Sequence, residues 1–178
     1  EKYFFFFLKK YNYTCLLAPS NSGKTTYFLS TKTWPKILIT GVNVENITPL
    51  NMDSIFTAGN VQFINIKSTN TNFIDISDAS VLIDEVHTFN SHDLLRLKNL
   101  LHGVPAELFV SMLPSSFSEN ILPNTKYLIS RANLVISIEA NCHLCGGKTS
   151  MSDLIKTKEI KSPHGEVIVG KSLFQSYC

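Results

Sequence analysis

The chain has 178 residues and a mass of 19.9 kDa, enough for one packed domain and a small appendage. Hydrophobic residues make up 44% and charged residues 17%, which argues against a disordered chain. The formal net charge of +2, with no long basic stretch carrying aromatics, does not indicate a nucleic-acid surface. The apolar run at 3–8 is shorter than the roughly 20 residues of a membrane-spanning helix. We interpret it as an extra strand or a cover for an apolar surface.

The first chemical motif follows a predicted buried strand at 13–17. Residues 18–25 read A-P-S-N-S-G-K-T, which fits a phosphate-binding loop, G-x-x-x-x-G-K-[ST], with Ala18 in place of the first glycine. Backbone N–H groups of such a loop cradle phosphate oxygens, while Lys24 reaches the outer phosphates and the Thr25 hydroxyl holds Mg²⁺. The residues expected to bind ATP and Mg²⁺ here are Ala18, Pro19, Ser20, Asn21, Ser22, Gly23, Lys24 and Thr25.

The next elements alternate between helix and strand. A helix is predicted to about Ser30, then a buried strand at 36–40 that ends at Gly41. Residues 42–60 are polar and predict a loop-rich segment, before a strand at 61–66 and a turn at 70–72.

A second chemical motif ends the apolar strand at 80–84. Asp84 and Glu85 follow V-L-I, and in phosphate-loop proteins a carboxylate at the tip of a neighbouring strand lies beside the Mg²⁺. We expect Asp84 to bind the metal and Glu85 to take a proton from a nucleophile. His87 follows the pair, and either contacts a phosphate or the substrate or simply packs.

The rest of the first domain continues the alternation. A leucine-rich helix is predicted from a cap at Asn90 or Ser91 to Gly103, followed by strands at 107–112 and 134–139. The fold class is therefore α/β, a P-loop (RecA-like), mainly parallel sheet with helices on both faces.

The alternating strand and helix pattern ends near residue 141, where Cys142 and Cys145 form a C-x-x-C metal-knuckle pattern. We expect a P-loop domain at 1–140 and a small zinc-knuckle subdomain at 141–178. Cys178 is a third ligand for a structural zinc, and the fourth is His143, His164 or a residue beyond the chain. The alternative is a knuckle of free thiols in a reducing compartment.

Together these motifs resemble the type II thymidine kinases, the small zinc-containing kinases of animals, bacteria and large DNA viruses. The loop is similar to that family's G-P-M-F-S-G-K-T-T, and I-D-E-V-H-T-F at 83–89 is similar to its I-D-E-x-Q-F-F. V-S-M-L-P-S-S-F at 110–117 is similar to V-x-x-L-D-G-T-F. The ending from Gly165 to Cys178 is similar to the lasso that closes over the substrate.

The resemblance implies a thymidine kinase that transfers the ATP γ-phosphate to the 5′-hydroxyl of thymidine or a related deoxynucleoside. It makes Glu85 the catalytic base and zinc a staple at the two ends of the lasso. It also implies a homotetramer or homodimer in the cytoplasm, the host's cytoplasm for a viral copy, and no membrane or nucleic-acid partner. The residues implied to bind substrate are Met112, Leu113, Phe117, Val167, Ile168 and Phe174.

Several departures from the family pattern leave two alternatives. His87 and Thr88 replace Gln and Phe, Pro114 and Ser115 replace Asp and Gly, and the family's D-x-R-Y element is missing. One alternative is a diverged relative that has lost catalysis. The other is a helicase ATPase fragment, since 84–87 also spells D-E-x-H.

Overall fold

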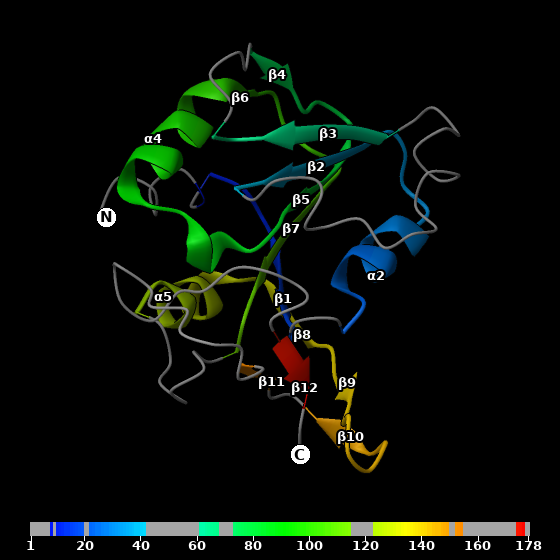
Figure 1. Ribbon diagram of the computed structural model, residues 1–178. Coiled ribbons are helices and arrows are strands. Elements are labelled where there is room, and N and C mark those ends of the chain that lie inside the picture. Colours follow the sequence, from blue (N-terminus) through cyan, green and yellow to red (C-terminus); the bar gives the residue numbers. More distant parts are fainter. Residues whose placement is uncertain are drawn as a thin grey trace.

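The core of the protein is one fully parallel sheet in a computed structural model that describes residues 8, 10–19, 22–41, 61–67, 73–114, 123–149, 152–154 and 174–176 (Figure 1). Its six strands lie in the order β3-β2-β5-β7-β1-β8 and every neighbouring pair is parallel. They are β1 (Thr14–Leu17), β2 (Lys36–Thr40), β3 (Val61–Asn65), β5 (Ser80–Ile83), β7 (Glu107–Met112) and β8 (Leu134–Ser137).

Helices cover both faces of the sheet, as expected (Figure 1). Successive strand residues point to opposite faces, so each strand supplies two cores. One core joins Leu16, Leu38, Leu82 and Phe109 to Phe28 and Leu29 of α2 (Lys24–Ser30). The other joins the alternate strand residues to the leucines of α4 (Ser91–Leu100) and to Leu128 of α5 (Pro123–Arg131).

The strand register brings the two chemical motifs to the same edge. β7 lies between β1 and β5, and Ile83 pairs with Val110 while Leu16 pairs with Ser111. Asp84 and the phosphate loop, which follow β5 and β1, therefore both lie at the carboxyl edge. They are not on adjacent strands as the sequence motif suggested, because β7 separates them.

The leucine-rich helix is shorter than expected. A capping box starts it, with the Asn90 side chain accepting from the Asp93 backbone N–H and the Asp93 side chain accepting from the Asn90 N–H. It ends at Leu100, and not at Gly103 as predicted. The next two residues form β6 (Leu101–His102), which pairs in parallel with β4 (Ile74–Asp75). This pairing with a distant segment takes Leu101 out of the helix.

Two short antiparallel pairs lie near the C-terminus (Figure 1). β9 (Ala140–Asn141) pairs with β10 (Lys148–Thr149), and β11 (Ser152–Leu154) pairs with β12 (Phe174–Ser176). The predicted segments at 42–60 and 70–72 and most of the apolar run at 3–8 lie outside the described residues. No helix within the described ranges has both the length and the apolar character needed to cross a membrane.

Candidate active site

The end of the phosphate loop is shaped by a left-handed glycine. Gly23 has φ 89° and caps α2, and its carbonyl accepts the Tyr27 N–H at 2.8 Å. This conformation is costly for a residue with a Cβ, which is why glycine is needed here. It starts the helix at Lys24 and turns that side chain into the protein, where it is 7% exposed.

The start of the loop is attached to β7. The Ala18 N–H donates to the Met112 carbonyl at 3.2 Å, so this amide is engaged within the sheet. Ala18 is fully buried, which explains why a small side chain stands there. The Ser22 N–H donates to the Pro19 carbonyl at 3.3 Å. The Ser22 hydroxyl oxygen is buried and has no hydrogen-bond partner in the described part of the chain.

The acidic segment also has an unusual backbone. Asp84 continues β5 and is 3% exposed, and its N–H donates to the Ile39 carbonyl at 2.8 Å. Glu85 has φ 54° and ψ 44°, a left-handed conformation that is uncommon for a residue other than glycine. A 3₁₀ turn, η2 (Val86–Thr88), follows, and both the N–H and the hydroxyl of Thr88 donate to the Glu85 carbonyl at 2.8 Å. Strained residues of this kind cluster at functional sites.

Lys24 and Glu85 join the two motifs. Lys24 Nζ lies 2.8 Å from Glu85 Oε1, and the side chains are 7% and 22% exposed. Burial pulls the pKa of Lys24 down, but the negative charges of Glu85 and Asp84 outweigh burial and raise the pKa above its ordinary value. Lys24 therefore carries a positive charge between the loop and the acidic segment.

Ser111 is a site residue that the sequence did not single out. It is fully buried on β7, its hydroxyl donates to Asp84 Oδ1, and its oxygen accepts the Glu85 N–H at 3.0 Å. Serine in a strand carries no local signal of such a role. Only the register of β5 against β7 places it beside Asp84.

His87 lies in the 3₁₀ turn after Glu85 and connects that turn to the residue that follows β7. It is 9% exposed, and its Nδ1 accepts the Leu113 N–H at 3.4 Å. Burial lowers its pKa to about 4; the negative charge of Glu85 opposes that shift and the positive charge of Lys24 adds to it. The imidazole is therefore neutral at physiological pH and acts as an acceptor at this nitrogen.

The residues expected on the substrate side are only partly described. Met112 is fully buried in the apolar core, so its side chain packs below the site and is not available to a ligand. Leu113, one residue further on, is partly exposed at the carboxyl edge. Phe174 lies in β12. Ser20, Asn21, Phe117, Val167 and Ile168 lie outside the described residues.

The predicted metal knuckle forms a tight turn between β9 and β10. The Gly146 N–H donates to the Cys142 carbonyl at 2.9 Å, and the Gly147 N–H donates to Cys145 Sγ at 3.4 Å. Cys142 is buried and Cys145 is exposed. Within the described ranges no three Cys, His, Asp or Glu side chains gather as metal ligands would, and Cys178 lies outside those ranges.

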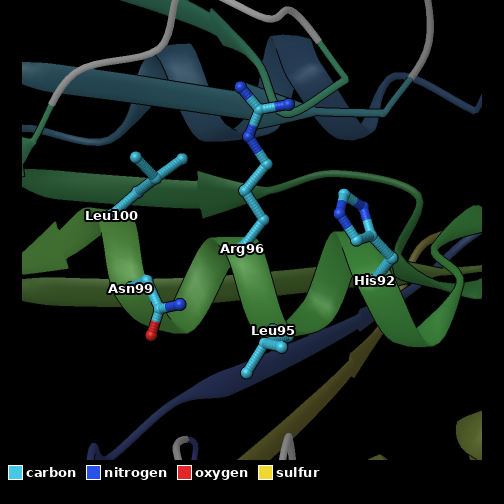
Figure 2. Close-up of a pocket in the computed structure, with 5 residues that line it drawn as sticks. All are labelled: His92, Leu95, Arg96, Asn99 and Leu100. Carbon is cyan, nitrogen blue, oxygen red and sulfur yellow. The ribbon is translucent and has the colours of Figure 1, made fainter.

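A pocket of about 420 Å³ lies on α4 and shares no residue with the site around Lys24. Figure 2 shows Arg96 and His92 extending from the same side of the helix. The other residues that line the pocket are Leu95, Asn99 and Leu100.

A phosphate loop and an acidic pair at the carboxyl edge of a parallel sheet define a P-loop nucleotide-binding α/β protein. The family model described as "Thymidine kinase" matches residues 13–178. The chain therefore belongs to the thymidine kinase family, which confirms the resemblance read from the motifs.

The chain is also similar in sequence to a curated protein and in part to a solved structure. A thymidine kinase of Pseudothermotoga lettingae is 28% identical over 140 residues, which cover 75% of each chain. Among solved structures, the arterivirus nonstructural protein 10 helicase in complex with DNA is 12% identical with a TM-score of 0.44. That match covers 75% of this chain, which spans only 37% of the helicase chain.

Proposed function

We propose that the protein transfers the γ-phosphate of ATP to the 5′-hydroxyl of thymidine or a related deoxynucleoside. The observation that carries this proposal is the 2.8 Å contact between Lys24 Nζ and Glu85 Oε1. The side chain expected to bind phosphate, Lys24, is therefore in direct contact with the candidate base, Glu85. Membership of the thymidine kinase family favours this chemistry over the helicase alternative.

The loop supplies the phosphate-binding half of the site. Lys24 is positively charged and nearly buried, so its attraction for phosphate oxygens is weakly screened by water. The buried Ser22 hydroxyl, without a partner in the described ranges, supports the assignment because it offers a further hydrogen bond to a phosphate.

Asp84 and Thr25 are the residues that would hold Mg²⁺. A carboxylate and a hydroxyl are the hard oxygen ligands that this ion prefers. The Asp84 carboxylate accepts a hydrogen bond from the Ser111 hydroxyl, which orients it at this edge of the sheet. When bound, Mg²⁺ neutralises charge that develops on the phosphate oxygens.

Glu85 is the proposed general base for the 5′-hydroxyl. Its left-handed backbone, fixed by two bonds from Thr88 to its carbonyl, holds the carboxylate near Lys24. Phosphates that draw Lys24 away would leave this carboxylate to accept the proton of the sugar hydroxyl. The proposed nucleoside pocket is formed by Leu113, Phe117, Val167, Ile168 and Phe174. Closing this pocket over the substrate would keep water from the reaction.

Glu85→Gln tests the proposal, because the amide keeps the shape of the side chain but cannot take the proton. We expect turnover to fall by about 10²- to 10⁴-fold while ATP affinity stays close to that of the parent. Glu107→Gln is the matched control, since Glu107 accepts from Ser80 at the opposite edge of the sheet. Turnover is measured across the four natural deoxynucleosides. A parent that binds ATP but phosphorylates none of them contradicts the proposal and supports the catalytically decayed alternative.

We further propose that Cys142, Cys145 and Cys178 bind a structural zinc. The Gly147 N–H donates to Cys145 Sγ, a contact that would orient the sulfur of a metal ligand, and C-x-x-C supplies two of four ligands. Cys142→Ser should lower the zinc content, as measured by atomic emission, while Cys15→Ser should not, since Cys15 is buried in β1. Equal zinc content in parent and Cys142→Ser would contradict the site.

On the basis of the family resemblance we also propose a kinase domain at 1–140 and a lasso subdomain at 141–178. We further propose assembly as a homotetramer or homodimer and a cytoplasmic location. Size-exclusion chromatography with light scattering tests the proposed assembly.

A further inference from the structure

Three successive residues at the end of β7, the last of them just beyond the strand, contact three different parts of the site. The Ser111 hydroxyl bonds Asp84 and Glu85, the Met112 carbonyl accepts from Ala18, and the Leu113 N–H donates to His87. The central strand therefore connects the phosphate loop to the acidic segment. Ser111 is the only one of the three that acts through its side chain.

The direction of both Ser111 hydrogen bonds is determined by chemistry. A backbone N–H can only donate, so the Ser111 oxygen accepts from Glu85. Its single proton is then directed to the Asp84 carboxylate. One hydroxyl thus orients the side chain of the first acidic residue and the backbone of the second.

Burial makes this arrangement rigid. Ser111 is fully buried and Asp84 is 3% exposed, so water does not readily replace the lost bond. Without the hydroxyl, a buried carboxylate oxygen loses a donor and the Glu85 N–H loses its acceptor. Glu85 also has a left-handed backbone, which persists only when its surroundings hold it.

We propose that Ser111 is a positioning residue for phosphoryl transfer, because its hydroxyl sets the Asp84 metal ligand and the Glu85 backbone relative to each other. This inference rests on the proposed nucleoside kinase function. It adds to that function a residue on β7 that acts through Asp84 and Glu85.

The test compares Ser111→Ala with Ser111→Thr, which keeps the hydroxyl. Two quantities are measured: Mn²⁺ affinity in the presence of ATP, by electron paramagnetic resonance, and the steady-state constants with Mg²⁺. We expect Ser111→Ala to weaken Mn²⁺ binding and lower kcat by about 10- to 100-fold, with the KM for the nucleoside changed much less. Ser111→Thr should restore most of both values.

Ser80→Ala is the matched control. Ser80 is also fully buried in the sheet and also donates to a carboxylate, Glu107 Oε2 at 3.0 Å, but at the opposite edge. A merely structural role predicts similar effects of both alanine variants. Thermal unfolding of all variants shows which of them fold. If the added methyl group of threonine prevents folding, Ser111→Cys replaces it and should fall between alanine and the parent.

The outcomes separate this inference from the proposed function. Ser111→Ala with Mn²⁺ affinity and kcat within about twofold of the parent overturns the inference. Equal losses in Ser111→Ala and Ser80→Ala also overturn it. A parent that phosphorylates no nucleoside refutes the kinase proposal instead, and the Mn²⁺ measurements still decide whether Ser111 positions the metal ligand.

Discussion

The two edges of the sheet each contain a buried lysine, but their surroundings differ. At the carboxyl edge, Lys24 lies 2.8 Å from the Glu85 carboxylate. At the amino edge, Lys36 Nζ donates to the Thr31 hydroxyl at 2.7 Å and the Thr33 carbonyl at 3.0 Å. It also lies 4.9 Å and 4.8 Å from the ring centroids of Phe28 and Trp34.

The difference in surroundings separates a binding lysine from a structural one. Burial lowers the pKa of Lys36 and the charge of Glu107 offsets this only in part, whereas two carboxylates raise the pKa of Lys24. Lys36 is held by fixed neutral groups of its own chain. Lys24 is held by a charge, which a phosphate group can replace without leaving the ammonium unpaired.

The largest expected effect comes from replacing each lysine by methionine. Lys24→Met removes a positive charge from the transferred phosphate, so kcat/KM should fall by about 10²- to 10³-fold. Lys36→Met removes two hydrogen bonds at the opposite edge and should leave kcat/KM near the parent value. Equal losses of kcat/KM in the two variants would contradict the assignment of Lys24 as the binding lysine and Lys36 as the structural one. The comparison uses variants that unfold cooperatively.

Histidines at the two edges provide the second prediction. The pKa of His87 is about 4 against an ordinary value of 6.5, so the unfolded chain binds this proton first as the pH falls. Stability that is present above pH 6.5 is therefore lost towards pH 4, by about 2 to 3 kcal/mol at pH 4.5. His87→Gln should lose that much less free energy of unfolding between pH 7 and pH 4.5.

His102 provides the matched control because it is exposed and packs edge-on against Phe73. Urea unfolding at the two pH values compares His87→Gln, His102→Gln and the parent. Parallel pH profiles for His87→Gln and the parent would contradict the prediction.

The smallest expected effect concerns the left-handed glycines of the two edges. An added Cβ on Gly23 meets no atom within 4 Å, so Gly23→Ala carries only a backbone cost of about 1 to 2 kcal/mol. On Gly103 the same atom collides with Ser77 Oγ, so Gly103→Ala should destabilise the fold more. Of the two, only Gly23→Ala should weaken ATP binding, as measured by isothermal titration. A Gly23→Ala variant that is less stable than Gly103→Ala would contradict the prediction.

The sequence predicts the features that a short contiguous stretch of residues encodes. The phosphate loop, the acidic pair and the apolar strands each have a contiguous pattern, and the structure places β1, β2 and β7 at or within one residue of their expected bounds. Family motifs then predicted the family, and the match over 13–178 confirms it.

The features that were missed depend on contacts between distant segments. Ser111 acquires its partners from the register of β5 and β7, which no local pattern encodes. The two-residue strands β4 and β6 are defined by their pairing with each other, which the local sequence does not show. The sequence pattern therefore predicted that the helix continues through Leu101. The helix α5 was also missed, because few of its side chains are both apolar and buried, with Leu128 the main contact to the core.

The antiparallel pair β11–β12 has a consequence for how this family can diversify. Ser152 pairs with Ser176 and Leu154 with Phe174, so the two ends of the intervening sequence are fixed side by side. The entropy of closing such a segment changes only slowly with its length. Insertions and deletions between these anchors therefore cost little free energy, and the parallel sheet that carries Lys24 and Asp84 need not change with them.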